Sequence, residues 1–180
     1  MAAILFLIIL FAILANILWY SFRYGITPTP TSYQVKKVVL QSLPVPNKGT
    51  IMELGSGWGN LAFSLAKHFP DHQIEAYEIS PFPYLISKLL AKLVAYPNLR
   101  FIRKDFFTFP LHEASLIVCY LYPGAMRRLK DKFERELHAG TYIISHTFAI
   151  PGWTPIRIRH AHDLYQTPVF VYQIKKSEPN

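Results

Sequence analysis

A glycine-rich turn between an apolar segment and an amphipathic one constrains this chain more than any other feature. Residues 50–54 (TIMEL) are typical of a short buried strand, and residues 61–68 of a helix. Between them, Gly55 and Gly57 allow a tight turn and a close approach of the backbone to a ligand. The helix that follows presents free N–H groups, which attract an anionic group. Glu53 ends the strand, two residues before the first glycine. The sequence therefore predicts a strand–turn–helix unit that binds a ligand.

The same alternation of strand and helix continues along the chain. Further strands are predicted over residues 73–79, 98–105, 115–121, 141–148, 156–160 and 169–174, and further helices over 81–96 and 125–137. The last two strands are expected to form a closing antiparallel pair. Repeated β-α-β units with right-handed crossovers predict an α/β fold, a doubly wound and mostly parallel seven-stranded sheet with helices on both sides.

Individual positions sharpen this expectation. Helix 125–137 is amphipathic and should turn one face inward, formed by Met126, Leu129, Phe133 and Leu137. Another helix should begin near Thr31, with a capping box between Thr31 and Gln34.

The first 22 residues carry no charged side chain. About 21 apolar residues suffice to cross a hydrocarbon core, and Trp19 and Tyr20 lie where an interfacial aromatic belt would be. We therefore predict a transmembrane helix over 1–22, a connector over 23–31 and a catalytic domain over 32–180. A cleaved signal peptide and a buried helix are the alternatives. Because Arg23 and further lysines follow the segment, the positive-inside rule places a single-pass protein with its domain on the cytoplasmic side.

Composition excludes several classes of protein. A chain of 180 residues fits one domain, and 51% hydrophobic with 17% charged residues excludes a disordered chain. The single cysteine, Cys119, excludes a disulfide framework and is expected to be an inert core thiol. His160 and His162 have no obvious third partner, so no metal site is expected. A net charge of +8 favours an anionic partner, such as an anionic membrane surface or an anionic cofactor.

Two carboxylates follow the glycine turn at the ends of later strands. Glu78 stands near the end of the second strand, where a carboxylate can accept hydrogen bonds from ribose hydroxyls. Asp105 follows the third strand and could hold an adenine amino group while Phe106 stacks on the base. The alternatives are an exposed Glu at a strand end and a turn Asp beside a core Phe.

This arrangement of acids and glycines resembles the class I, seven-strand S-adenosylmethionine-dependent methyltransferases over roughly residues 32–175. The resemblance implies S-adenosyl-L-methionine as the cofactor, with its methionine part at the glycine turn. Four further segments are similar to the protein-lysine methyltransferases of the mitochondrial ADP/ATP carrier and the ATP synthase c-subunit: residues 28–30, 77–81, 122–123 and 148–155.

The narrower likeness implies N-methylation of a lysine in a membrane-associated protein. The cofactor-binding positions that these resemblances and the motifs indicate are Thr29, Glu53, Gly55, Ser56, Gly57, Glu78, Asp105 and Phe106. Tyr122 and Pro123 are implied to lie beside the transferred methyl group. The sequence departs from the family at Trp58 and Asn60, where the family usually has Asp and Arg. Trp58 either walls the methionine pocket or packs between helix and sheet.

A lysine amine must lose its proton before it can accept a methyl group. An aromatic, partly desolvated pocket formed by Tyr120, Tyr122 and Trp153 would disfavour the ammonium form. The alternatives are a lipid or quinone methyltransferase, a non-catalytic membrane-tethered module that binds the cofactor, and a nicotinamide enzyme. We expect no nucleic-acid partner, and the sequence does not indicate an oligomeric state.

Overall fold

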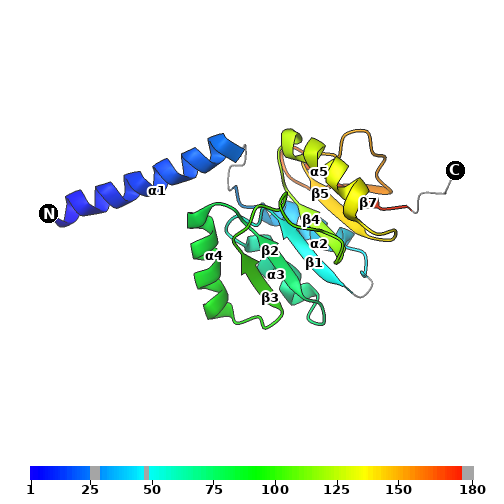
Figure 1. Cartoon of the computed structure of the whole chain (residues 1–180), viewed down its shortest axis with the longest axis horizontal. Helices are drawn as coiled ribbons and strands as arrows, with labels where there is room; N and C mark the ends of the chain where they lie inside the picture. The colour runs from blue at the N-terminus through cyan, green and yellow to red at the C-terminus, as the bar shows by residue number, and fades with distance from the viewer. Residues whose placement is uncertain (25–28, 47–48, 176–180) are drawn as a thin grey trace.

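The computed structural model describes residues 1–24, 29–46 and 49–175. Figure 1 shows a long N-terminal helix that projects from an α/β domain. The helices are α1 (Ala2–Tyr24), α2 (Tyr33–Ser42), α3 (Asn60–His68), α4 (Pro81–Val94) and α5 (Pro123–Glu136). The strands are β1 (Thr50–Leu54), β2 (Ile74–Tyr77), β3 (Leu99–Ile102), β4 (Ala114–Cys119), β5 (Tyr142–His146), β6 (Arg157–His160) and β7 (Pro168–Gln173).

Within the described residues, the strands form a seven-stranded sheet in the order β3-β2-β1-β4-β5-β7-β6. The first five pair in parallel, and β7 lies antiparallel between β5 and β6. The predicted doubly wound, mostly parallel sheet and its closing antiparallel pair are confirmed. The chain leaves β1 toward β2 on one side and later returns to place β4 on the other side. A crevice therefore opens at the carboxyl end of β1, where such folds bind their ligands.

Two hydrophobic clusters cover the two faces of the sheet. One joins α2 and α3 to side chains such as Ile51 and Val118. The other joins α5 to the alternate residues, such as Met52 and Ile117. Alternate residues of each strand point to opposite faces, so the central strands are apolar on both. The predicted inward face of α5 is confirmed, since its four apolar positions all lie in the second cluster.

Cys119 ends β4 inside the second cluster. Its side chain has no exposed surface, and burial raises the pKa of the thiol to about 12. The prediction of an inert core thiol is confirmed, because a thiol with so high a pKa is not ionised at neutral pH.

The N-terminal helix is present, but its assignment as a membrane span is not confirmed. α1 covers Ala2–Tyr24 and exposes apolar side chains such as Phe6, Phe11 and Leu18. Among the described residues, no helix meets the combined length and apolarity required to cross a bilayer. The predicted connector 23–31 falls partly outside the described residues, which omit 25–28.

The predicted capping box at the start of α2 is wrong. Ser32, with extended φ and ψ, is the N-cap, and its hydroxyl accepts a hydrogen bond from the Val35 N–H at 3.3 Å. Thr31 lies one residue too early, and its hydroxyl instead lies 3.3 Å from Nε2 of His146. A hydroxyl serves as an N-cap only at the residue that directly precedes the first helical turn.

Candidate active site

The crevice at the carboxyl end of β1 brings together residues from four stretches of the chain. It lies between the β1–α3 turn, the ends of β2 and β4, and the segment that precedes α2. Its lining residues are Thr29, Pro30, Thr31, Glu53, Gly55, Ser56, Gly57, Trp58, Asn60, Glu78 and Tyr120. Six of the eight predicted cofactor-binding residues are among them.

Glu53 is the most unusual group in this cleft. Its side chain is buried, and Oε2 has no hydrogen-bond partner within the described residues. Burial raises the pKa of the Glu53 carboxyl well above its ordinary value, and the nearby Glu78 carboxylate adds to the shift. A backbone hydrogen bond from Ala62 counteracts it in part. A buried acceptor without a partner is costly, so Glu53 is poised to accept a hydrogen bond from a cationic ligand.

Ser56 repeats this feature on the glycine turn. Its hydroxyl is buried and also without a partner in the described part of the chain. Two unsatisfied polar atoms thus line the same small cleft. They match a ligand that carries an ammonium group and hydrogen-bonding oxygens, as the amino-acid end of S-adenosylmethionine does.

Glu78 stabilises the glycine turn from the end of β2. Its two carboxylate oxygens accept hydrogen bonds from the Gly57 N–H at 2.8 Å and the Ser80 N–H at 2.7 Å. Each carboxylate oxygen can accept a second hydrogen bond. Glu78 can therefore hold the turn and still receive a ligand hydroxyl, as predicted for the ribose.

The turn itself requires glycine at Gly55. Its φ is +81°, and an added Cβ would lie 2.8 Å from Cδ2 of Leu121. Trp58 lines the cleft and packs edge-to-face on Phe82, with ring centroids 5.9 Å apart. Asn60 donates from Nδ2 to the carbonyl of Thr31 at 2.9 Å, which ties the segment before α2 to the start of α3. Both departures from the family pattern therefore lie at the cleft.

A stacked pair of rings, Tyr120 and His146, borders the cleft. Sequence reasoning identified only Tyr120 of the two. Tyr120 lies against His146 with centroids 4.2 Å apart and planes inclined by 23°. His146 is buried, and burial lowers its pKa to about 4, so the imidazole is neutral at pH 7. Its two nitrogens lie near the hydroxyls of Thr31 and Thr147, at 3.3 and 3.2 Å.

Thr147 adds backbone strain at this position. Its φ is +69°, which is a rare conformation for a β-branched residue. Such strain is concentrated at functional sites. The position of His146 at the carboxyl end of a parallel strand was the signal in the sequence that could have identified it.

Several predicted residues lie outside the cleft lining. Asp105 uses Oδ1 to accept the Phe107 N–H at 2.9 Å, which closes a local turn. Phe106 is buried in the α5-side cluster, so its ring is not free to stack on a base in this conformation. Tyr122 is the N-cap of α5, and Pro123 is its first residue.

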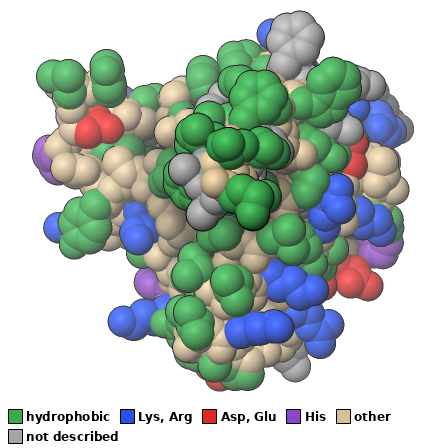
Figure 2. Space-filling model, turned by 90° about the vertical axis from the view of Figure 1, so that its left-hand side faces the viewer, with side chains coloured by type: hydrophobic (Ala, Val, Ile, Leu, Met, Phe, Trp, Pro, Cys, Tyr) green, Lys and Arg blue, Asp and Glu red, His purple; other side chains and the backbone are tan. Residues whose placement is uncertain are grey.

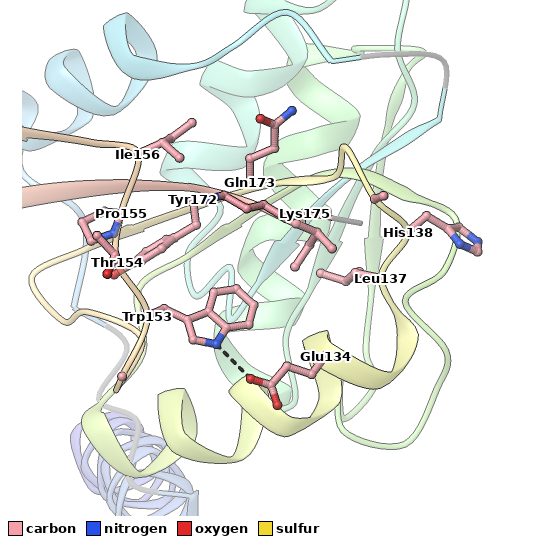
Figure 3. Close-up of a pocket in the computed structure, with 13 residues that line it drawn as sticks. Glu134, Leu137, His138, Trp153, Thr154, Pro155, Ile156, Tyr172, Gln173 and Lys175 are labelled. Carbon is pink, nitrogen blue, oxygen red and sulfur yellow. Dashed lines mark hydrogen bonds between the residues drawn. The ribbon is translucent and has the colours of Figure 1, made fainter. Parts of the chain in front are cut away.

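Trp153 lies in a different cavity, of about 800 Å³ (Figure 3). Its indole N–H donates to Oε1 of Glu134 at 3.0 Å, and its ring meets Tyr172 edge-on with centroids 6.0 Å apart. The structure does not bring this ring to the cleft at β1. The loop between β5 and β6 instead holds it over α5 and β7, where it covers apolar side chains.

Comparisons with known proteins agree with this geometry. The fold resembles an RNA methyltransferase from Salinibacter ruber, solved with S-adenosyl-L-homocysteine, at a TM-score of 0.71 and 25% identity. The match covers 84% of this chain and 97% of the other. The fold and the cleft define a class I methyltransferase that uses S-adenosyl-L-methionine.

Sequence comparison places the chain within that class. The model of the ANTKMT methyltransferase domain matches residues 53–157, and the chain belongs to this family. A protein-lysine N-methyltransferase of Saccharolobus islandicus (strain REY15A) is 28% identical over 137 residues, which are 74% of this chain and 84% of the relative.

Two mammalian relatives are longer than this chain. They are the adenine nucleotide translocase lysine N-methyltransferase of Mus musculus and the Homo sapiens lysine N-methyltransferase of the ATP synthase c-subunit, each 27% identical over 126 residues. These matches cover 69% of this chain but only 54% and 52% of the two relatives. The resemblance to this group of lysine methyltransferases is confirmed.

The cleft residues fit the cofactor. The unsatisfied Glu53 carboxylate and Ser56 hydroxyl match its amino-acid end, and the carboxylate of Glu78 retains capacity for its sugar. In the described residues, no three His, Cys, Asp or Glu side chains gather as metal ligands would.

Proposed function

We propose that this enzyme transfers a methyl group from S-adenosyl-L-methionine to the side-chain amine of a lysine in a membrane-associated protein. The observation that carries the proposal is the buried, unsatisfied Oε2 of Glu53 in a cleft bordered by the Tyr120 ring. The lysine and membrane-protein parts are supported by the names of the relatives.

The cofactor supplies an electrophilic methyl group on a sulfonium centre, and the protein's task is alignment. Glu53 and Ser56 would hold the amino-acid end, while Glu78 both fixes the Gly57 N–H and receives a ribose hydroxyl. The described cleft has an open volume of only about 30 Å³. Binding therefore requires the cleft to widen, and we expect the wall formed by Thr29 to Thr31 to move, with the hydrogen bonds of Thr31 to Asn60 and His146 giving way.

The substrate amine needs a site that tolerates its neutral form. A lysine with a pKa near 10.4 costs about 4–5 kcal/mol to deprotonate at pH 7. The ring of Tyr120 on the cleft wall offers a partly desolvated aromatic surface, which disfavours the ammonium. The part of this ring that His146 does not cover can also hold the cationic methylated product by a cation–π contact. The stacked His146 is neutral and so adds no repelling charge.

Tyr122, Pro123 and Trp153 remain predictions as substrate-positioning residues. Tyr122 and Pro123 begin α5, which starts three residues after Tyr120, the residue that borders the cleft. This proximity along the chain supports a role at the methyl group. Trp153 would need a rearrangement of the β5–β6 loop to reach it.

Action at a membrane surface, where the enzyme would meet its substrate, is part of the proposal. It is supported by the exposed apolar side chains on α1 and by the membrane proteins named for two relatives. The placement of the catalytic domain on the cytoplasmic side stays a prediction from the charges that flank α1.

The test uses the full chain with methyl-labelled S-adenosylmethionine and a membrane preparation. Lipid and protein are then separated, and the protein is hydrolysed to detect methylated lysine. The proposal predicts label in methyl-lysine. Label confined to the lipid fraction would instead assign a lipid or quinone substrate, and cofactor binding without any transfer would indicate a non-catalytic module.

Two variants control this assay. Glu53→Gln should lose the label, because it weakens cofactor binding. Glu113→Gln removes an exposed carboxylate that precedes β4, at the opposite end of the sheet, and should retain it.

A further inference from the structure

The helix α4 shows an inverted pattern of burial. Leu85, Leu89 and Leu93 stand at i, i+4 and i+8, so they form one stripe along the helix. These leucines are exposed, with Leu93 at 77%. The buried residues of α4 are instead Pro83 and Ser87. The residues that α4 buries fully are thus small ones, and its leucines face outward.

Further apolar residues widen this outward face. Leu90 and Val94 are also exposed and follow the stripe on one side. Lys88 and Lys92 follow it on the other side, and both are exposed. An exposed apolar stripe bordered by lysines is typical of a helix that lies in a membrane interface.

The chain segment that contains α4 carries charge of a single sign. From Ile79 to Lys104 the chain contains no Asp or Glu. The same 26 residues contain Lys88, Lys92, Arg100, Arg103 and Lys104. The surface that presents the leucines is therefore complementary to an anionic surface.

The position of α4 beside α1 extends this surface. α1 contacts α4. Arg103 donates from Nη2 to the Tyr20 hydroxyl of α1 at 3.5 Å and from Nε to the carbonyl of Ile79, two residues before α4, at 3.4 Å. Figure 2 views this side of the molecule, with α1 pointing toward the viewer. Hydrophobic and basic side chains predominate there, and few acidic ones are visible.

We propose that α4 lies flat on an anionic lipid bilayer, with its leucines in the headgroup–acyl boundary and Lys88 and Lys92 at lipid phosphates. A second copy of this chain fits the surface poorly, because two such helices would bring lysines together without a carboxylate to pair them. This surface is separate from the cofactor cleft, and it also explains how a domain on an apolar α1 would be held against its substrate's membrane.

The test labels single cysteines in the full chain with a polarity-sensitive fluorophore. The native Cys119 has no exposed surface and a pKa of about 12, so it does not compete at neutral pH. One probe replaces Leu93 (Leu93→Cys) and a control probe replaces Leu164, which is 89% exposed between β6 and β7 (Leu164→Cys). Each labelled chain is titrated with vesicles of phosphatidylcholine alone or with phosphatidylglycerol, and flotation reports total binding.

The proposal predicts that the Leu93 probe moves to an apolar environment only on vesicles with phosphatidylglycerol, while the Leu164 probe does not respond. The double variant Lys88→Gln and Lys92→Gln should raise the lipid concentration at half-response roughly 30-fold, because each lost lysine is expected to weaken binding about fivefold. The matched pair Arg127→Gln and Arg135→Gln, exposed on α5, should leave it near the original value.

Three results would overturn the proposal. The Leu93 probe could stay in water although the chain floats with vesicles, which would leave binding to α1 alone. It could respond equally without anionic lipid. It could also become shielded without lipid as the protein concentration rises, which would identify a second copy as the occupant. Cofactor binding, measured on the same samples, reports separately on the proposed function.

Discussion

Replacement of Glu53 by Gln separates the stability of the fold from its capacity to bind the cofactor. In the wild-type protein a buried carboxylate oxygen has no partner, which costs about 1–3 kcal/mol for a polar group and more when it is charged. Glu53→Gln removes the charge at nearly constant volume. We expect the cofactor-free variant to be more stable by about 1–3 kcal/mol at pH 7, which corresponds to a Tm higher by roughly 2–10 °C.

The pH dependence of stability is an independent check on the sign of this stability difference. Because burial raises the pKa of Glu53, the folded protein holds a proton there above the ordinary value of 4.5, where the unfolded chain has lost it. The free energy of unfolding therefore falls as the pH rises from about 4.5 through the raised pKa, and this loss is complete above it. The difference between wild type and Glu53→Gln should be small near pH 4 and should grow across that window.

Cofactor binding should change in the opposite direction. A hydrogen bond between charged groups contributes about 1.5–3 kcal/mol, so Glu53→Gln should weaken binding of S-adenosylhomocysteine about 10- to 150-fold by calorimetry. Glu113→Gln is the matched control and should change neither quantity. A Glu53→Gln variant that is less stable than wild type without cofactor, or that binds the cofactor normally, would contradict the role of Glu53 as an unpartnered acceptor for the ligand.

Three further substitutions test other parts of the account. Gly55→Ala should destabilise the protein by about 1–2 kcal/mol and weaken cofactor binding, because φ is +81° and the new Cβ meets Leu121; Gly140→Ala, with φ +90° and no atom within 4 Å, should retain binding in calorimetry. His146→Gln should reduce the loss of stability at acid pH, measured as the free energy of unfolding in denaturant at a series of pH values. Because the pKa of His146 is lowered to about 4, the wild type loses up to about 3 kcal/mol of this free energy as the pH falls from 6.5 to 4. An unchanged loss in the variant would contradict burial of the neutral imidazole. Asn98→Ala should lower the free energy of unfolding by about 1–3 kcal/mol, because its amide donates to three backbone carbonyls at and beyond the end of α3; a stability equal to that of wild type would argue against these hydrogen bonds.

The sheet could be predicted because its signals are local and repeated. Apolar strands such as 115–121 alternate with amphipathic helices such as 125–137, and right-handed crossovers then leave few topologies. The glycine turn was predictable for the same reason, since strand, turn and helix are contiguous. The cleft residues at the ends of β1 and β2 follow from the rule that parallel strands share a carboxyl edge.

Features set by tertiary packing escaped sequence reasoning. Trp153 belongs to a loop whose path across α5 no local pattern encodes, and its partner Glu134 is 19 residues away. Phe106 looked available for stacking, but its ring is buried in the hydrophobic cluster that also contains the apolar residues of α5. The stack of His146 on Tyr120 joins the ends of two neighbouring strands, which only the sheet order brings together.

A crystal structure of the chain with S-adenosylhomocysteine would show directly where the cofactor binds. We expect the ligand's amino group to lie within hydrogen-bonding distance of Oε2 of Glu53 and its ribose to lie at Glu78, with the segment 29–31 displaced to widen the cleft. A ligand seated in the cavity beside Trp153, or a cleft that stays closed at saturating ligand, would contradict it.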